Sequence, residues 1–107
     1  MVLNCRLDRS DRSRQLGLAL PRWAPADRYF LVGTGTFALA RTAVRAGLPA
    51  RKLTPLEGES PGAVFEELMG AAGRSALVVG AGNIAGIGLE LVQYFQNRSW
   101  LPGEHAA

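Results

Sequence analysis

Residues 75–95 read SALVVGAGNIAGIGLELVQYF and contain the clearest strand-to-helix pattern in the chain. The uncharged run at 76–79, ALVV, is rich in β-branched residues, which is typical of a strand buried on both faces of a parallel sheet. Glycines follow, and then Leu91, Val92 and Phe95 recur at helical spacing among polar residues. The pattern predicts a strand at 76–79, a tight glycine turn and a helix.

The glycines after the predicted strand formally match GxGxxA. Residues 80–85 read GAGNIA, where glycines allow a sharp turn and let helix amides approach a phosphate. A dinucleotide fingerprint also requires a second strand and an acidic residue about 20 residues further on. Only residues 97–107 follow the helix, and Glu104 has no strand before it. We therefore interpret the segment as a structural turn that can touch a ligand, not as a cofactor motif.

The same order of strand and helix recurs along the rest of the chain. This alternation predicts an α/β fold, a Rossmann-like three-layer sandwich with a mostly parallel sheet of about four strands and alternating helices. We expect one domain at residues 1–97 and a flexible tail at residues 98–107. The expected strands cover residues 2–5, 28–33, 51–53 and 76–79.

Two of the expected helices carry the clearest signals. Ser60 is a suitable N-cap before Pro61 at the first helical position, and Gly73 suits the C-terminal end of the same helix. In the helix after the second strand, Phe37, Ala40 and Val44 line one face, and Arg41 and Arg45 share another.

Length and composition restrict the class of protein. A chain of 107 residues with 48% apolar residues and a mean hydropathy of +0.06 fits a single α/β domain. No apolar run approaches the roughly 18 residues that a membrane span needs. Arg6, Asp8 and Arg9 interrupt the start before a signal peptide can form, so we expect a cytoplasmic location. With Cys5 and His105 as the single cysteine and histidine, we expect no metal site and no internal disulfide.

The charges are divided between the two halves of the sequence. Residues 1–53 hold ten Lys and Arg against three Asp, a net charge of +7, and residues 54–107 hold two Arg against six Glu, a net charge of −4. The basic half can attract a nucleotide phosphate, a polycarboxylate or an acidic partner, or it is a solvated surface without a ligand. We expect no nucleic acid partner, because the arginine-rich segment lacks interleaved aromatics and contains Asp8 and Asp11.

In a parallel sheet, ligands bind beyond the carboxyl ends of the strands. Here these ends correspond to the loops Asn4–Arg9, Gly33–Thr36 and Gly80–Asn83, which we predict to form the candidate site. In the first loop, Arg6 and Arg9 can each bind a phosphate or a carboxylate through two hydrogen bonds, while the aspartate between them orients the guanidinium. The alternative is a salt-bridge cluster at the start of a helix.

Two kinds of chemistry have no support in the sequence. No GxxxxGK[ST] phosphate loop is present, so we expect no ATPase or ligase activity from this chain in isolation. The carboxylate pairs Glu57/Glu59 and Glu66/Glu67 lie on an expected loop and an expected helix surface without basic or apolar surroundings. We interpret all four as solvated charges without a catalytic role.

Two segments resemble a known family. Residues 2–12, VLNCRLDRSDR, and residues 79–86, VGAGNIAG, are similar to segments of the C-terminal domain of the ATP-dependent ligase subunit of poly-gamma-glutamate synthase, a relative of the Mur ligases and of folylpolyglutamate synthase. In between, the family has a strand that ends in a glycine turn, as residues 31–34 do here, so the resemblance covers nearly the whole chain. By position, the family motifs correspond to Asn4, Arg6, Asp8, Arg9, Gly80, Gly82 and Asn83.

The resemblance implies an enzyme of capsule or poly-gamma-glutamate biosynthesis. Such a ligase activates a glutamate carboxylate with ATP as an acyl phosphate, and the amine of an incoming glutamate attacks it to form a gamma-linked amide. ATP and magnesium would be bound mainly by an N-terminal or central domain that is missing here, and not by this chain alone. The implied partners are that domain, glutamate or polyglutamate, and integral-membrane synthase subunits at the inner face of the cell membrane.

The length of the chain leaves a second interpretation open. A truncated gene, a split subunit or a fragment of a longer ligase would each give this sequence. A non-catalytic Rossmann-type module that binds an anionic small molecule is the alternative. An in-frame upstream segment that encodes GxxGK[ST] would favour the ligase.

Overall fold

The computed structural model describes residues 1–23, 25–73, 76–82 and 86–99 of the chain. Within these residues, strands and helices alternate from the first strand to the last helix. The elements in chain order are β1 (Val2–Cys5), η1 (Leu7–Arg9), α1 (Ser10–Trp23), β2 (Tyr29–Gly33), α2 (Thr36–Arg45), η2 (Ala50–Lys52), β3 (Leu53–Pro55), α3 (Pro61–Ala72), β4 (Gly80–Gly82) and α4 (Ile87–Ser99).

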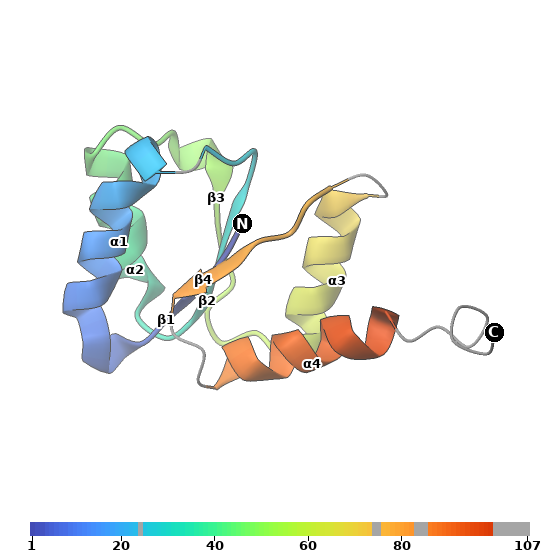
Figure 1. Ribbon diagram of the computed structural model, residues 1–107. Coiled ribbons are helices and arrows are strands. Elements are labelled where there is room, and N and C mark those ends of the chain that lie inside the picture. Colours follow the sequence, from blue (N-terminus) through green and yellow to red (C-terminus); the bar gives the residue numbers. More distant parts are fainter. Residues whose placement is uncertain (24, 74–75, 83–85, 100–107) are drawn as a thin grey trace.

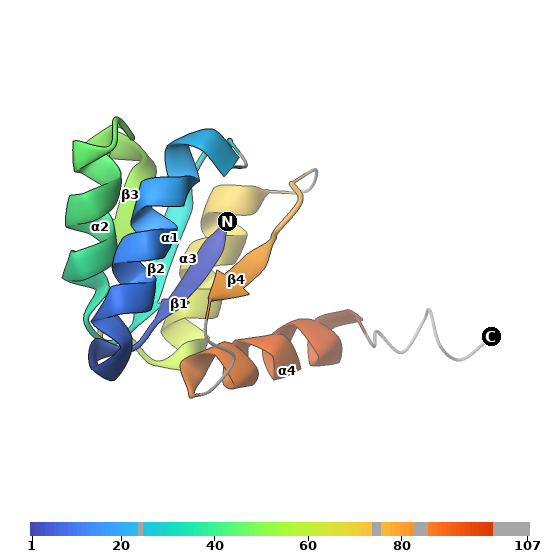
Figure 2. The same cartoon turned by 60° about the vertical axis from the view of Figure 1, so that its left-hand side comes forward.

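The strands form one parallel sheet in the order β3-β2-β1-β4 (Figure 1). One hydrophobic cluster joins the sheet to α1 and α2, and a second cluster joins its other face to α3 and α4. In Figure 2, α1 and α2 lie together in front of the sheet, and α3 lies behind it. The predicted α/β fold, a Rossmann-like sandwich of three layers around a parallel sheet, is therefore confirmed.

β1 is one of the two central strands, and it contributes residues to both hydrophobic clusters. It pairs with β2 on one side and with β4 on the other. All four of its residues are buried, with Leu3 and Cys5 in the α1/α2 cluster and Val2 in the α3/α4 cluster. A strand buried on both faces is what a parallel sheet requires, because the helices of its crossovers cover both sides.

The strand predicted at residues 76–79 was wrong in position. Those residues are not in a strand, and Leu77 is 86% exposed, whereas β4 consists of residues 80–82. In register, Gly82 lies opposite Asn4 of β1, so close that a Cβ on residue 82 would be 2.5 Å from the Asn4 carbonyl oxygen. Gly80 and Gly82 thus belong to the sheet and not to a turn, and the missing side chain of Gly82 allows the close approach to β1.

The two helices with the clearest sequence signals both form where they are predicted. The Ser60 hydroxyl caps α3 by accepting a 3.2 Å hydrogen bond from Ala63 N, and Gly73 ends this helix with a φ of 66°. In α2, the predicted apolar face is only partly buried: Ala40 packs against the core, whereas Phe37 is 61% and Val44 is 43% exposed. α2 instead buries mainly small residues, because it packs closely against α1.

α4 contacts α3 and continues beyond the predicted end of the domain. Phe65 of α3 contacts the rings of Tyr94 and Phe95, at centroid distances of 5.5 and 5.1 Å. α4 ends at Ser99, so the predicted boundary falls inside this helix, and the rest of the predicted tail lies outside the described residues. No helix among the described residues is long and apolar enough to cross a membrane.

The two glycines of β4 should respond differently to substitution. Gly82 has a φ of 97° and no room for a Cβ, whereas a Cβ on Gly80 would meet no atom within 4 Å. We expect Gly82→Ala to lower the free energy of unfolding by about 1–3 kcal/mol and Gly80→Ala to change it by less than about 0.5 kcal/mol. Chemical denaturation measures both values, and equal effects of the two substitutions would contradict the register of β4.

Candidate functional site

The carboxyl ends of β1, β2 and β4 meet at one edge of the sheet, as expected for parallel strands. Asn4 lies opposite Gly82, and the next residue of β1 lies opposite Gly33. Of the candidates on the last strand, Gly80 and Gly82 therefore flank β1, and Asn83 lies outside the described residues. The structure brings the first and last predicted loops together through direct strand pairing.

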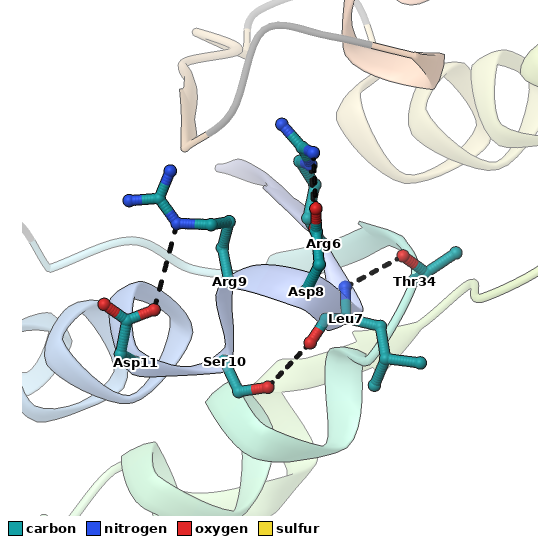
Figure 3. A network of polar contacts seen from close by, with 7 residues as sticks. All are labelled: Arg6, Leu7, Asp8, Arg9, Ser10, Asp11 and Thr34. Carbon is teal, nitrogen blue, oxygen red and sulfur yellow. Dashed lines mark hydrogen bonds and ion pairs between the residues drawn. The ribbon is translucent and has the colours of Figure 1, made fainter.

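The two candidate arginines each face an aspartate that is near in sequence (Figure 3). The Arg6 guanidinium donates two hydrogen bonds to Asp8, from Nε to Oδ1 at 3.0 Å and from Nη2 to Oδ2 at 2.6 Å. Arg9 Nε lies 3.9 Å from Asp11 Oδ1. Both aspartates are exposed and both arginines are partly exposed, and such pairs contribute only about 0–1 kcal/mol to stability. The role of both arginines in ligand binding stays a prediction.

The second predicted loop is tied to the first and closed by Glu57. Leu7 N donates a 3.0 Å hydrogen bond to Thr34 Oγ1 (Figure 3). Glu57 Oε1 accepts hydrogen bonds from Thr36 N at 2.8 Å and from Thr36 Oγ1 at 2.9 Å. These bonds, that of the amide first, hold the pKa of the Glu57 carboxyl below its usual value, and the Gly35 amide acts in the same direction. The N-terminal amide of α2 thus already binds a carboxylate from the chain itself.

The interpretation of Glu57 as a solvated charge was therefore incomplete: its side chain is exposed, but its carboxylate also accepts two hydrogen bonds from Thr36. Its carboxylate caps α2 by binding the amide and the hydroxyl of the first helical residue. Sequence reasoning missed this contact because the two residues are 21 positions apart and meet only after β2 and β3 have paired. No local pattern around Glu57 signals it.

A cavity of about 510 Å³ lies beside β1 and β4, where the connections that leave these two strands go to opposite faces of the sheet. The chain passes from β1 to α1 on one face of the sheet, whereas α4, the helix after β4, lies on the other face. This divergence is a topological switch point, the place where open parallel sheets bind ligands. We name the cavity the switch-point crevice, and it is lined by Asn4, Cys5, Arg12, Ser13, Gln15, Leu16, Ala19 and Gly82.

The switch-point crevice combines buried polar groups with a cation. Asn4 and Ser13 are only 6% and 4% exposed. Burial raises the pKa of the Cys5 thiol, and the hydrogen bond from Ser13 offsets this shift only in part, so the thiol is protonated at neutral pH and is not a nucleophile. The Arg12 guanidinium makes no hydrogen bond or ion pair with any described residue. The arrangement can bind an anion but offers no group for covalent catalysis.

Arg12 was not among the residues predicted for the site. It belongs to a stripe on one side of α1, at positions i, i+3, i+4 and i+7, formed by Arg12, Gln15, Leu16 and Ala19. This stripe lines the switch-point crevice together with Gly82 of β4. This stripe is visible in the sequence once the start of α1 is known. The prediction failed because only the loop residues before the helix were considered.

A second cavity, of about 540 Å³, lies on the opposite face of the sheet against α4. Its walls are mostly apolar and include Val2, Leu68 and Leu91. Asn4 and Gly82 line both cavities, so they form the partition between them. No charged side chain of the described residues lines this second cavity, and nowhere in the described ranges do three His, Cys, Asp or Glu gather as metal ligands.

The sheet order and the switch-point crevice define a Rossmann-like α/β domain with an anion-compatible cavity at its carboxyl edge. The model of the poly-gamma-glutamate synthase CapB C-terminal domain matches residues 1–98, so the chain belongs to this family. A relative, the PGA synthase CapB of Bacillus subtilis (strain 168), is 29% identical over 93 residues, which are 87% of this chain and 23% of the relative. The chain thus spans about a quarter of that relative. No solved structure matches.

Removal of the Glu57 carboxylate should destabilise the domain in a pH-dependent way. The folded-state pKa is lowered, so the stabilisation is present above the unfolded pKa of about 4.3 and is lost as the pH falls through the folded value. We expect Glu57→Ala to cost about 0.5–1 kcal/mol at pH 7, the lower part of the range for helix caps, because the side chain is exposed.

Thermal melting of wild type, Glu57→Ala and the control Glu59→Ala between pH 3 and pH 7 checks this expectation. Glu59 is exposed and has no side-chain contact with α2 among the described residues, so its variant should melt like wild type. A loss for Glu57→Ala that stays constant down to pH 3 would exclude the carboxylate as the cause.

Proposed function

We propose that this chain is the C-terminal domain, or a fragment, of an ATP-dependent acid-amino acid ligase that makes gamma-linked polyglutamate. The observation that carries the proposal is the family match over residues 1–98, which includes the first-strand motif and the glycine-rich motif of β4. The similarity to a protein described as a PGA synthase supports the same substrate class. The cavity at the switch point supports a ligand at the carboxyl edge of the sheet.

The proposed reaction forms one amide bond in each cycle. A glutamate carboxylate would take the terminal phosphate of ATP and release ADP, and the amine of the incoming glutamate would then displace phosphate. We propose that the rest of the enzyme makes most contacts with ATP and magnesium. One observation supports this division: Glu57 occupies the N-terminal amide of α2, so this helix end is not free for a phosphate.

The part of this chain in the reaction would be to hold a second substrate at the carboxyl edge. The side chains of Arg6 and Arg9 are 43% and 38% exposed, and each faces an aspartate on one side only, which leaves both arginines accessible to a ligand. Asn4 and Gly82 border both cavities and would contact a ligand in either. Asp8 would orient Arg6 through its two hydrogen bonds.

We also propose that the chain works within a larger assembly. The partners would be the remaining ligase domain, integral-membrane synthase subunits, and glutamate or polyglutamate, at the inner face of the cell membrane. Exposed apolar side chains support a covering partner: Leu77, Val79, Leu89 and Val92 are 42–86% exposed along the approach to β4 and on α4. The relative of which this chain spans 23% contains further chain that could cover this surface.

Deletion of codons 1–98 from the gene in its source cells tests the proposed function. We expect the cells to lose poly-gamma-glutamate, measured in hydrolysates as gamma-linked glutamate, while a Glu59→Ala control keeps wild-type amounts because that side chain is exposed and away from the crevice. Unchanged polymer in the deletion strain, or no polymer in wild-type cells, would contradict the ligase. Either result would favour the non-catalytic module that binds an anionic small molecule.

A further inference from the structure

Arg12 differs from the other arginines at this edge of the sheet. Arg6 is held by Asp8, and Arg9 lies beside Asp11, whereas Arg12 has no hydrogen-bond or ion-pair partner in the described part of the chain. Arg12 is also the one cation among the described residues that line the switch-point crevice. A guanidinium in this position can bind an anion without first giving up a contact of its own.

The rest of the crevice wall fits a small organic anion. Gln15 adds an amide next to Arg12, and Leu16 and Ala19 add apolar surface further along the same side of α1. Among the described residues that line the crevice, none is acidic, so this part of the wall does not repel a carboxylate. The volume of about 510 Å³ falls within the roughly 300–1,000 Å³ of small-molecule sites. Arg12 lies near the N-terminal end of α1, where the helix dipole also favours negative charge.

We propose that the switch-point crevice binds a carboxylate or phosphate through Arg12, and that in this protein the anion is a carboxylate of a gamma-linked glutamate chain. Both kinds of anion accept two parallel hydrogen bonds from a guanidinium, so a nucleotide is the other possible source. The short methylene segments of a gamma-glutamyl chain suit Leu16 and Ala19, whereas the described lining residues include no aromatic side chain that could stack on a nucleotide base. The choice of ligand rests on the proposed function, but the anion site itself does not.

NMR titration of the 107-residue chain with tri-gamma-glutamate and, separately, with ADP tests the proposal. We expect tri-gamma-glutamate to shift the amide signals of residues 12–16 and of Gly82 in a saturable way. Arg12→Gln should weaken this binding by about tenfold or more, because it removes a charge-assisted contact. The matched control is Arg14→Gln, which removes the same charge from the same helix without altering the crevice lining, and its affinity should stay within about twofold.

Both variants replace exposed side chains, so their melting temperatures should equal that of wild type and loss of binding cannot come from unfolding. Equal losses in Arg12→Gln and Arg14→Gln would show only a general attraction to a basic domain and would overturn the site. Saturable shifts with ADP alone, lost in Arg12→Gln, would support the anion site but overturn the glutamate chain as its ligand. No binding of either ligand by wild type would overturn the proposal, while the polymer assay would still decide the proposed function.

Discussion

At the carboxyl end of β1, the neighbouring strands β2 and β4 lie so close to its backbone that only glycine fits at the contact positions. Gly82 on one flank and Gly33 on the other have φ values of 97° and 93°, and a Cβ on either residue would collide with the carbonyl groups of Asn4 or Cys5. These contacts fix the registers of β4 and β2 against β1. The edge at which the three strands end, and with it the switch-point crevice, depends on this close approach.

At this edge of the sheet, some charged groups have a partner within the chain, and one cation beside the crevice has none among the described residues. The amide end of α2 receives the carboxylate of Glu57, which comes from the acidic half of the sequence. On the neighbouring loop, Asp8 and Asp11 face Arg6 and Arg9, but Arg12 has no partner among the described residues. Arg12 belongs to the basic half of the sequence, residues 1–53, which has a net charge of +7. Its guanidinium lies beside the switch-point crevice.

The range of an interaction determines whether the sequence could predict it. The alternation of strands and helices is a local pattern, and so are the Ser60 cap and the Gly73 end of α3, which the structure confirms. The position of β4 and the buried face of α2 depend on contacts with β1 and α1, so apolar runs alone misplaced β4 and could not give the burial of α2. The fold class alone predicted which edge of the sheet carries the site. The contact of Glu57 with α2 could not be predicted, because it forms only when β2 and β3 pair.

The role of the switch-point crevice is tested most directly by intermolecular nuclear Overhauser effects between the 107-residue chain and ¹³C-labelled tri-gamma-glutamate. We predict contacts from the ligand methylenes to the methyl groups of Leu16 and Ala19, which line the crevice beside Arg12. Contacts to Leu68 and Leu91 in the opposite cavity, without contacts to Leu16 and Ala19, would place the ligand on the other face of the sheet and contradict this role.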